Sequence, residues 1–509
     1  MSIRGNLAIS AGRLARWGGQ VAFGRSAGNL PGVIALKIDP LVLCQLAKKV
    51  DPIAVVSGTN GKTTTNNLVA DCLAASGKPL YCNREGNNLQ AGVVTSLLVP
   101  PVVTSPTGPL AAAPASPEAS SEVSPQASPD APGTDASTAT PIGSFECDEL
   151  YTRYVLPRLK PRFFMLLNLF RDQLDRFGEI DHTQDVIVEA LTSSPQTTFV
   201  YNGDDPICAG IAQRIPNKTV AFGISTPLGL EADRISDSRF CQSCGAELAY
   251  EYVHYSQLGA YSCPACGWKR PELQFAAHDV RHEAEGFSFQ IDGQTIQTYH
   301  HGVYMVYNVL AAYAISQLSG EVNVAQIQDA VRNYRPTNGR LQTFEVGERQ
   351  VMTNLAKNPV GFNQNIRIVL NEQGRVFALF VNDNDPDGHD VSWFWDIDFE
   401  NWADIQGLKA FVGGSRANDM QVRLKYAGIP AQLVDSVADV LAATGPQDGK
   451  VYVIANYTAL PQVRAELNKL VVEAPAPVPA VAPVPAQAPA PEPAPATAST
   501  SAAEKEARS

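Results

Sequence analysis

A chain of 509 residues with 45% hydrophobic content has room for about two to four globular domains. Its formal net charge of −12 argues against a nucleic-acid-binding protein, which needs a concentrated basic surface. No apolar run approaches the roughly 20 residues needed to cross a bilayer, so the sequence predicts no transmembrane segment.

The N-terminal segment, residues 1–50, begins with "MSIRGNLAISAGRLARWGGQVAFG", in which three arginines interrupt short apolar pieces. A secretion signal would contain an uninterrupted apolar stretch. The pattern instead predicts an amphipathic helix, which either packs on the protein or touches a membrane surface. Five of the nine cysteines are scattered through apolar or mixed segments, as expected in a reducing compartment. We therefore expect a cytoplasmic protein, peripheral to the inner membrane if this helix contacts lipid.

Residues 51–340 alternate short β-rich runs with helical patterns, which predicts an α/β domain with a mostly parallel sheet. Early in this region, "VVSGTNGKTTTNNLV" runs from a strand through a glycine-rich turn into a helix. Such a turn wraps phosphate oxygens with backbone N–H groups, while its lysine reaches the β- and γ-phosphates and its threonine binds Mg²⁺. An ordinary glycine-rich turn is the alternative. The candidate nucleotide-binding residues are Gly58, Thr59, Asn60, Gly61, Lys62, Thr63 and Thr64.

A Pro-, Ala- and Ser-rich segment, residues 101–143, cannot bury enough apolar surface to fold. We expect it to be a disordered insertion in a surface loop, and a stalk between two domains is the alternative. After it, "FECDE" places carboxylates at the end of a short strand. Glu146 is the candidate Mg²⁺ ligand beside Thr63, because Mg²⁺ prefers hard oxygen ligands.

Two C-x-x-C pairs lie within residues 236–272 and supply Cys241, Cys244, Cys263 and Cys266. This spacing is typical of a zinc ribbon. Four thiolates complete a tetrahedron and leave no open position, so the zinc is expected to be structural. The intervening "ELAYEYVHYS" alternates like a strand, which predicts a β-hairpin that carries the metal.

The alternation restarts after residue 340 and predicts a smaller, Rossmann-like α/β domain over residues 341–472, followed by a disordered Pro/Ala-rich tail over residues 473–509. In this domain, "NDNDPDGHDVSWFWD" crowds five aspartates and two tryptophans together. Its first half fits the opening of a calcium-binding loop, but Phe394 stands where a bidentate Glu is required. A solvated turn and a surface that meets another protein remain as alternatives.

Six motifs resemble, in order, the central ATPase domain of the Mur ligases: "GTNGKTT", "FECDE", "LNLFRDQLD", "YNGDDP", "YNVLAAYA" and "GRLQTF". These enzymes use ATP to activate a carboxylate as an acyl phosphate, which an amine then attacks. The resemblance covers about residues 30–470 apart from the insertion, and it implies that Asn308 and Arg340 also bind the nucleotide. Within the family, the ribbon, "LAKNPVGFNQ" and the acidic run are similar to the ligase subunits of lipid II isoglutaminyl synthases, which work with a GatD glutaminase subunit.

Three departures separate the chain from the amino-acid-adding Mur ligases. Only about 50 residues precede the glycine-rich turn, which is too few for a UDP-binding domain. Asn354, Lys357, Asn358 and Pro359 stand where those ligases carry a D-x-x-H-N-P-type motif. Gln173 replaces a usual histidine and thereby removes one expected metal ligand.

The sequence contains no evident glutaminase, because no cysteine lies in a G-x-C-x-G turn or has a neighbouring histidine. We therefore expect a heterodimer with a GatD-like glutaminase that supplies ammonia. The expected reaction amidates the D-glutamate α-carboxylate of the lipid II stem peptide, with Lys62 and Mg²⁺ stabilising charge during phosphoryl transfer. The resemblance places the acidic run at the glutaminase, where Asp390, or in second place Asp387, would orient the glutaminase imidazole. A stand-alone ligase of the Mur or folylpolyglutamate type and a non-enzymatic zinc-ribbon scaffold are the alternatives.

Overall fold

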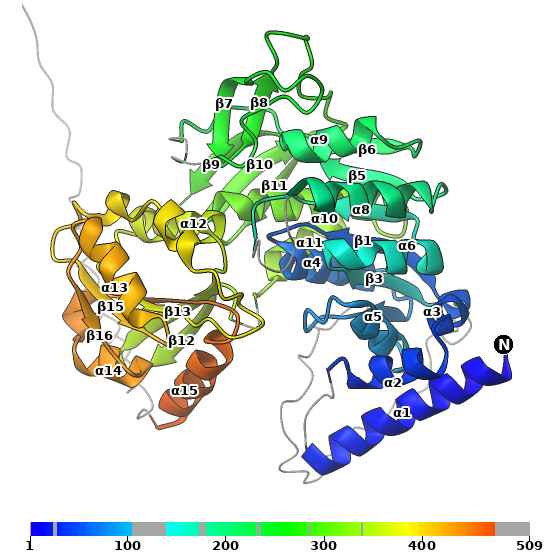
Figure 1. The fold of residues 1–509 in the computed structure, drawn as a ribbon, viewed down its shortest axis with the longest axis horizontal. Coiled ribbons are helices and arrows are strands. Elements are labelled where there is room, and N and C mark those ends of the chain that lie inside the picture. The colour runs from blue at the N-terminus through cyan, green and yellow to red at the C-terminus, as the bar shows by residue number, and fades with distance from the viewer. Residues whose placement is uncertain are drawn as a thin grey trace, which may run out of the picture.

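The computed structural model describes residues 2–23, 28–103, 139–172, 180–230, 233, 236–283, 286–336 and 339–473. This part of the chain forms a group of N-terminal helices and two α/β bodies (Figure 1). Most of the predicted insertion, almost all of the predicted tail and Gln173 lie outside the described residues.

The first body is built on a nine-stranded sheet with the order β11-β10-β9-β6-β5-β4-β1-β3-β2. Neighbouring strands from β2 to β9 are parallel, whereas β9, β10 and β11 pair antiparallel at one edge. The central strands are buried nearly throughout, as in sheets covered on both faces. The strands are β1 (Asp51–Ser57), β2 (Leu80–Cys82), β3 (Ile142–Glu146), β4 (Phe163–Leu166), β5 (Thr198–Asn202), β6 (Thr219–Ile224), β9 (Phe275–Glu283), β10 (Gly286–Ile291) and β11 (Gln294–Thr298).

Helices cover both faces of this sheet, and each face has its own hydrophobic cluster. One face is covered by α4 (Lys62–Ala74), α10 (Val303–Ser319) and α11 (Val324–Asn333). The other face is covered by α5 (Gln90–Leu97), α6 (Thr152–Leu159), α8 (Ile180–Thr192) and α9 (Pro206–Gln213), with the short helix η2 (Glu149–Tyr151) before α6. The strand–helix alternation predicted from the sequence is therefore present.

The Pro-rich insertion joins two neighbouring strands of this one sheet. Strand β2 precedes it and β3 follows it, and the two strands pair in parallel from Leu80 and Ile142 onward. Chain on both sides of the insertion thus belongs to the same body, while residues 104–138 of the insertion itself lie outside the described part.

The N-terminal residues form α1 (Ile3–Phe23), α2 (Leu30–Ile38), α3 (Val42–Leu46) and the short helix η1 (Ala47–Lys49). Helix α2 lies between α1 and α5, so α1 is the outermost element at this end of the molecule (Figure 1). Among the described residues, no single helix is long and apolar enough to cross a membrane. Two consecutive helical segments, Leu30–Ile38 and Val42–Lys49, together have the length and apolar composition of a membrane span, but they are bent by 101° relative to each other.

The predicted hairpin is confirmed. Strands β7 (Ala249–Tyr255) and β8 (Leu258–Ser262) pair antiparallel and form a separate two-stranded sheet. One cysteine pair precedes β7 and the other follows β8, so the hairpin brings both pairs to one end.

The second body contains a six-stranded sheet with the order β12-β13-β17-β14-β15-β16, parallel except at the β12 edge. Because parallel strands end at the same edge, the loops after β13, β14 and β17 converge there. The strands are β12 (Gln342–Val346), β13 (Arg349–Leu355), β14 (Val376–Phe380), β15 (Lys409–Gly413), β16 (Ala431–Leu433) and β17 (Val451–Ala455). The helices are α12 (Pro359–Asn371), η3 (Ser392–Asp396), η4 (Phe399–Trp402) and α13 (Ala417–Tyr426) on one face, and α14 (Val437–Ala442), η5 (Pro446–Asp448) and α15 (Leu460–Glu473) along the rest of the body.

Trp402 is the largest fully buried side chain of the second body, and its substitution tests how that body is held together. Its ring centroid lies 3.9 Å from that of Phe377, and its indole N–H donates to the Ile366 carbonyl at 3.2 Å. We expect Trp402→Ala to lower the free energy of unfolding by about 3–5 kcal/mol, because it leaves a cavity and an unpaired carbonyl. Denaturant titration followed by circular dichroism measures the loss. Trp395→Ala, at a half-exposed position, should cost about 1 kcal/mol or less, and an equal cost for both would contradict this account.

Candidate active site

A glycine-rich turn joins β1 to α4 and forms the centre of the site. Gly58 and Gly61 have φ angles of 132° and 88°, which side chains rarely adopt. A Cβ atom on Gly61 would also lie 2.4 Å from Oδ1 of Asn308, on α10. Asn168 holds the turn from the other side, because its Oδ1 accepts the Asn60 N–H at 2.9 Å and its Nδ2 donates to the Asn60 carbonyl at 3.1 Å. The turn is therefore fixed in a shape that only glycine permits at two positions.

Lys62 opens α4 and is buried against a carboxylate. Its Nζ donates to Oε1 of Glu149 at 3.0 Å, and the Gly58 N–H donates to the same oxygen at 3.0 Å. Burial alone would lower the pKa of Lys62, but the negative charges of Glu149, Glu146 and Asp148 outweigh it and raise the pKa. The ammonium is therefore protonated throughout the ordinary pH range, as a phosphate-binding cation must be.

Thr63 and Glu146 lie together, as the sequence predicted for a Mg²⁺ site. The Thr63 hydroxyl donates to Oε2 of Glu146 at 2.6 Å, and Asn88 Nδ2 donates to Oε1 at 3.1 Å. All of these groups are hard oxygens or their hydrogen-bond partners, which suits Mg²⁺ rather than a softer metal. Thr63 and Glu146 are the two residues of this cluster that could hold the ion.

The turn opens into a cleft between the two bodies, with an empty volume of about 1020 Å³ including its open mouth. The first body contributes the glycine-rich turn and the predicted Asn308 and Arg340. The second body contributes the end of β13, the residues that lead into α12, the first turns of α12 and one residue after β17. The lining residues from the second body include Asn354, Leu355, Ala356, Lys357, Val360, Gly361, Gln364, Asn365 and Tyr457.

Polar contacts join the two bodies at this cleft. The side-chain amides of Asn60 and Asn358 exchange hydrogen bonds of 3.3 and 3.2 Å. Lys357 forms an ion pair with Asp172. Arg171 reaches across to Asp396 at 3.2 Å. Val360 of the second body also packs in the hydrophobic cluster of the first, so the two bodies are held by directional polar contacts together with some apolar packing.

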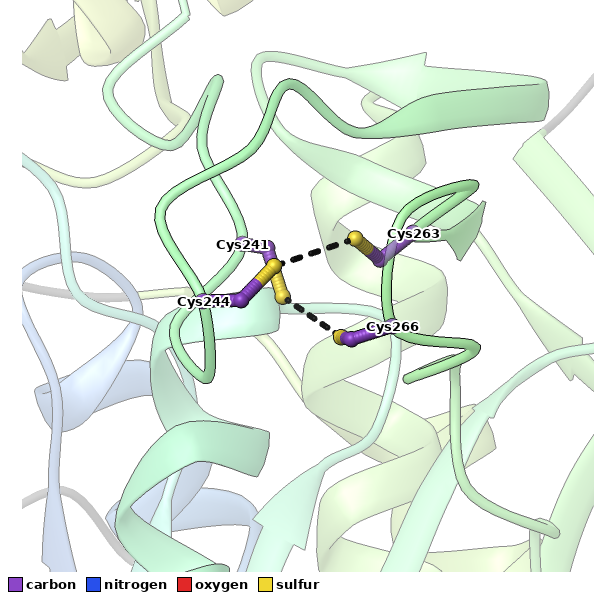
Figure 2. Close-up of side chains that lie close together, drawn as sticks. All are labelled: Cys241, Cys244, Cys263 and Cys266. Carbon is purple, nitrogen blue, oxygen red and sulfur yellow. Dashed lines mark hydrogen bonds between the residues drawn. The ribbon is translucent and has the colours of Figure 1, made fainter.

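The four predicted metal-binding cysteines lie together, and their Sγ atoms are all within 4.8 Å of one another (Figure 2). Cys244 and Cys263 are 3.5 Å apart, and Cys241 and Cys266 are 3.7 Å apart. A tetrahedral zinc with Zn–S bonds of about 2.3 Å requires sulfur atoms about 3.8 Å apart, so the cluster fits the ion. N–H groups of Cys266 and Ala265 donate to the Cys263 sulfur and lower its pKa to about 7.

The two candidate aspartates of the acidic run after β14 differ in their exposure to solvent. Asp390 is exposed, and its Oδ1 accepts the N–H of Ser392 at 2.8 Å. Asp387 is buried and accepts the Thr458 N–H at 3.0 Å as well as the Thr458 hydroxyl. Thr458 follows Tyr457, which lines the cleft. Asp387 therefore ties the acidic run to the rim of the cleft, and Asp390 is the one of the pair that is available to another protein.

Several residues of the site were not singled out by sequence analysis. Glu149 has no motif that marks it as the partner of Lys62, although it belongs to the quoted "FECDE". Asn88 lies in a segment without a local signature, and Asn168 belongs to the quoted "LNLFRDQLD", in which nothing marks it as the residue that holds the turn. Tyr457 comes from a strand end about 400 residues after the glycine-rich turn, and only folding brings it to the cleft.

Comparison with known proteins finds relatives by sequence and by fold. A family model described as the MurT ligase C-terminal domain matches residues 355–460. The MurT subunit of the glutamine-hydrolysing lipid II isoglutaminyl synthase of Staphylococcus aureus (strain N315) is 33% identical over 469 residues, which cover 91% of this chain and 97% of that protein. The corresponding subunit of Streptococcus pneumoniae (strain ATCC BAA-255 / R6) is 32% identical over 472 residues, with the same two shares.

Two solved structures show the same fold. A pseudomurein peptide ligase type C from Methanothermus fervidus has a TM-score of 0.60 and 18% identity, and the match covers 84% of this chain and 80% of that one. The MurF ligase of Thermotoga maritima in complex with ADP has a TM-score of 0.54 and 14% identity, and the match covers 85% of this chain and 84% of that one.

The fold is that of the Mur ligases, which confirms the predicted fold class. The relatives, named as subunits of a synthase, confirm the predicted enzyme. Sequence identity then resolves the branch within that class. The chain belongs to the MurT family of ligase subunits.

The cysteine cluster predicts a metal dependence that can be measured on the purified chain. Cys244→Ser removes one of the four sulfur ligands at an exposed position. We expect the zinc content, measured by mass spectrometry, to fall from about one ion per chain, and the β7–β8 hairpin to become sensitive to limited proteolysis. Cys44→Ser, outside the cluster, should leave both unchanged, and full retention of zinc by Cys244→Ser would contradict the assignment.

The position of Lys62 predicts a loss of phosphoryl transfer when its charge is removed. Lys62→Ala should lower ADP formation by about 10²–10³-fold, the range seen when a single charge-stabilising group is deleted. A coupled assay for ADP measures it, with nucleotide binding followed in parallel. Lys78→Ala is the matched control, because Lys78 follows α4 and pairs with Glu321 at the surface. Similar activity in the two variants would refute a role for Lys62.

Proposed function

We propose that this protein amidates the D-glutamate α-carboxylate of the lipid II stem peptide to D-isoglutamine, with ammonia from a glutaminase subunit. The proposal rests above all on the MurT family membership, since those relatives are named as subunits of a glutamine-hydrolysing lipid II isoglutaminyl synthase. The chemistry of the cleft and of the acidic run supports it step by step.

In the first step, an oxygen of the substrate carboxylate attacks the γ-phosphorus of ATP. The bond between that phosphorus and the β–γ bridging oxygen breaks, so that ADP leaves and an acyl phosphate forms. Lys62 provides a fixed positive charge next to the glycine-rich turn, whose N–H groups bind phosphate oxygens. Mg²⁺, held by Thr63 and Glu146, would neutralise phosphate charge. Asn308 and Arg340 line the same cleft and are assigned to the nucleotide.

In the second step, ammonia attacks the acyl carbon, the carbon–oxygen bond to phosphate breaks, and the nitrogen loses a proton. Free ammonia is scarce at neutral pH, so a source next to the cleft is required. Burial raises the pKa of four of the five described cysteines outside the cluster: to about 12 for Cys72 and Cys82, and upward for Cys147 and Cys208 as well. Such thiols are poor nucleophiles. This supports a GatD-like partner as the site of glutamine hydrolysis.

The acidic run is the proposed docking site of that partner. Asp390 projects from the loop that Asp387 fastens beside the cleft. Its carboxylate would orient the imidazole of the partner's Cys–His pair. Trp395 is half exposed beside the exposed Tyr426, and aromatic side chains of this kind are enriched at binding hot spots.

The cysteine cluster is assigned a structural zinc, because it provides four sulfur ligands and no open position. ATP as substrate and the unpaired cysteines favour a cytoplasmic location, and a lipid-linked substrate would bring the enzyme to the inner membrane face. A stand-alone ligase that adds an amino acid is the second candidate, and formation of ADP with an amino acid but without a partner would support it.

The decisive experiment incubates the chain with a GatD-like glutaminase, lipid II, ATP and Mg²⁺, and follows lipid II by mass spectrometry. With glutamine, one carboxylate should become an amide. Asp390→Asn should reduce glutamine-dependent amidation by about 10²-fold or more, because the partner's imidazole loses its orienting carboxylate, while amidation from added ammonium continues.

Asp385→Asn is the matched control, since Asp385 is an exposed aspartate of the same loop. It should retain glutamine-dependent amidation. Equal losses in the glutamine and ammonium reactions of Asp390→Asn would assign Asp390 to the ligase itself and reject its role for the partner. Absence of amidation with either nitrogen source in the unmodified complex would reject the proposed function.

A further inference from the structure

The outward face of α1 carries a stripe of five exposed apolar side chains. Ile3 is 90% exposed, Leu7 61%, Leu14 66%, Trp17 63% and Val21 68%. With the exposed Ser10, these residues are spaced alternately by four and three positions, so they lie along one side of the helix. The stripe runs from the first turn of α1 nearly to its last.

The opposite face of α1 is packed too closely for the helix to turn the stripe inward. Gly5, Ala8 and Gly12 are buried on that face. A Cβ atom on Gly12 would lie 2.6 Å from Leu98 Cδ1 and 3.1 Å from the Pro31 carbonyl oxygen. The small residues therefore determine which side of α1 faces α2, and the large apolar residues face away from the protein.

The charge at this end of the molecule has the opposite sign to that of the whole chain. Residues 1–49 contain seven lysines and arginines and one aspartate, whereas the chain as a whole carries −12. Helix α1 itself has three arginines and no carboxylate. At about 100° per residue, Arg4 and Arg13 fall on opposite flanks of the stripe. Their Nε atoms donate to the carbonyls of Ile38 and Leu98, which holds both side chains at the edge of the helix.

The apolar stripe and the flanking arginines together indicate which kind of partner covers this face of α1. In a coiled coil, a second copy would need carboxylates beside the apolar seam to pair with its arginines, and α1 has none. An anionic lipid surface satisfies both features, because the apolar side chains enter the acyl boundary while the arginines contact headgroups. Tryptophan is also favoured at that depth.

We propose that α1 docks flat on the anionic surface of a lipid bilayer through this stripe, flanked by Arg4 and Arg13. The inference depends on the stripe and its charge and not on the proposed reaction. If that reaction is also correct, α1 would hold the ligase on the surface that carries its lipid-linked substrate.

The test uses the full-length chain and vesicles of phosphatidylglycerol and phosphatidylcholine, without ATP or lipid II, so its outcome is independent of the proposed reaction. We expect co-sedimentation with the mixed vesicles that weakens with added salt, and little with phosphatidylcholine alone. The double variant Leu14→Gln/Trp17→Gln should bind the vesicles at least about tenfold more weakly, because two large apolar side chains no longer enter the lipid. Arg4→Glu/Arg13→Glu keeps the stripe and should lose the preference for anionic vesicles.

Leu433→Gln/Val471→Gln changes two exposed apolar residues of the second body and is the matched control. It should bind like the unmodified chain, and circular dichroism should show all variants to be folded. Unchanged binding of Leu14→Gln/Trp17→Gln would overturn the proposal. Failure of the unmodified chain to bind anionic vesicles would also overturn it. So would a Leu14→Gln/Trp17→Gln variant that still binds vesicles but no longer forms a dimer or a complex with the glutaminase.

Discussion

The hydrogen-bonded amides of Asn60 and Asn358 stand at the point on which the rest of the site depends. Asn60 belongs to the glycine-rich turn after β1, and Asn358 caps α12 directly after β13. Each turn lies at the carboxyl end of parallel strands, where the loops of such sheets converge. Neither body forms the cleft alone, because the first provides the phosphate-binding groups and the second provides the opposite wall. Their relative position is therefore as important to the chemistry as any single side chain.

Electrostatic balance within the cleft follows from the same arrangement. The buried charge of Lys62 is stabilised by Glu149, whose carboxylate lies 3.0 Å away and accepts a hydrogen bond from the ammonium group. Lys357 from the second body adds to the positive charge that lowers the pKa of Glu149 against the effect of burial. Asp148, beside them, has its pKa raised to about 6 by burial and by the charge of Glu149. The acids and lysines at this edge thus form one coupled group that spans both bodies.

The periphery of the molecule is specialised at three separate places. The cysteine cluster lies at one end of the β7–β8 hairpin, where a bound zinc would hold the two cysteine pairs together. The acidic run is fastened to the rim of the cleft by Asp387 and leaves Asp390 exposed. Helix α1 is the outermost of the N-terminal helices (Figure 1) and presents exposed apolar residues. Under the proposed function, the acidic run would meet the protein that supplies ammonia, and α1 would meet the membrane that carries the lipid-linked substrate.

The sequence by itself determined the features that are local in the chain. The glycine-rich turn, the cysteine spacing and the strand–helix alternation each have a short pattern with a direct physical cause, and the structure contains all three. Only the tertiary structure decided the partners that come from distant segments. Glu149 and Asn168 lie in quoted motifs, but the motifs do not say that Glu149 pairs with Lys62 or that Asn168 holds the turn, and Tyr457 has no motif at all. Sheet order and packing bring these residues to the site. The same holds for Asp387 and Asp390, since equivalent positions in an acidic run differ only once one of them is buried against Thr458.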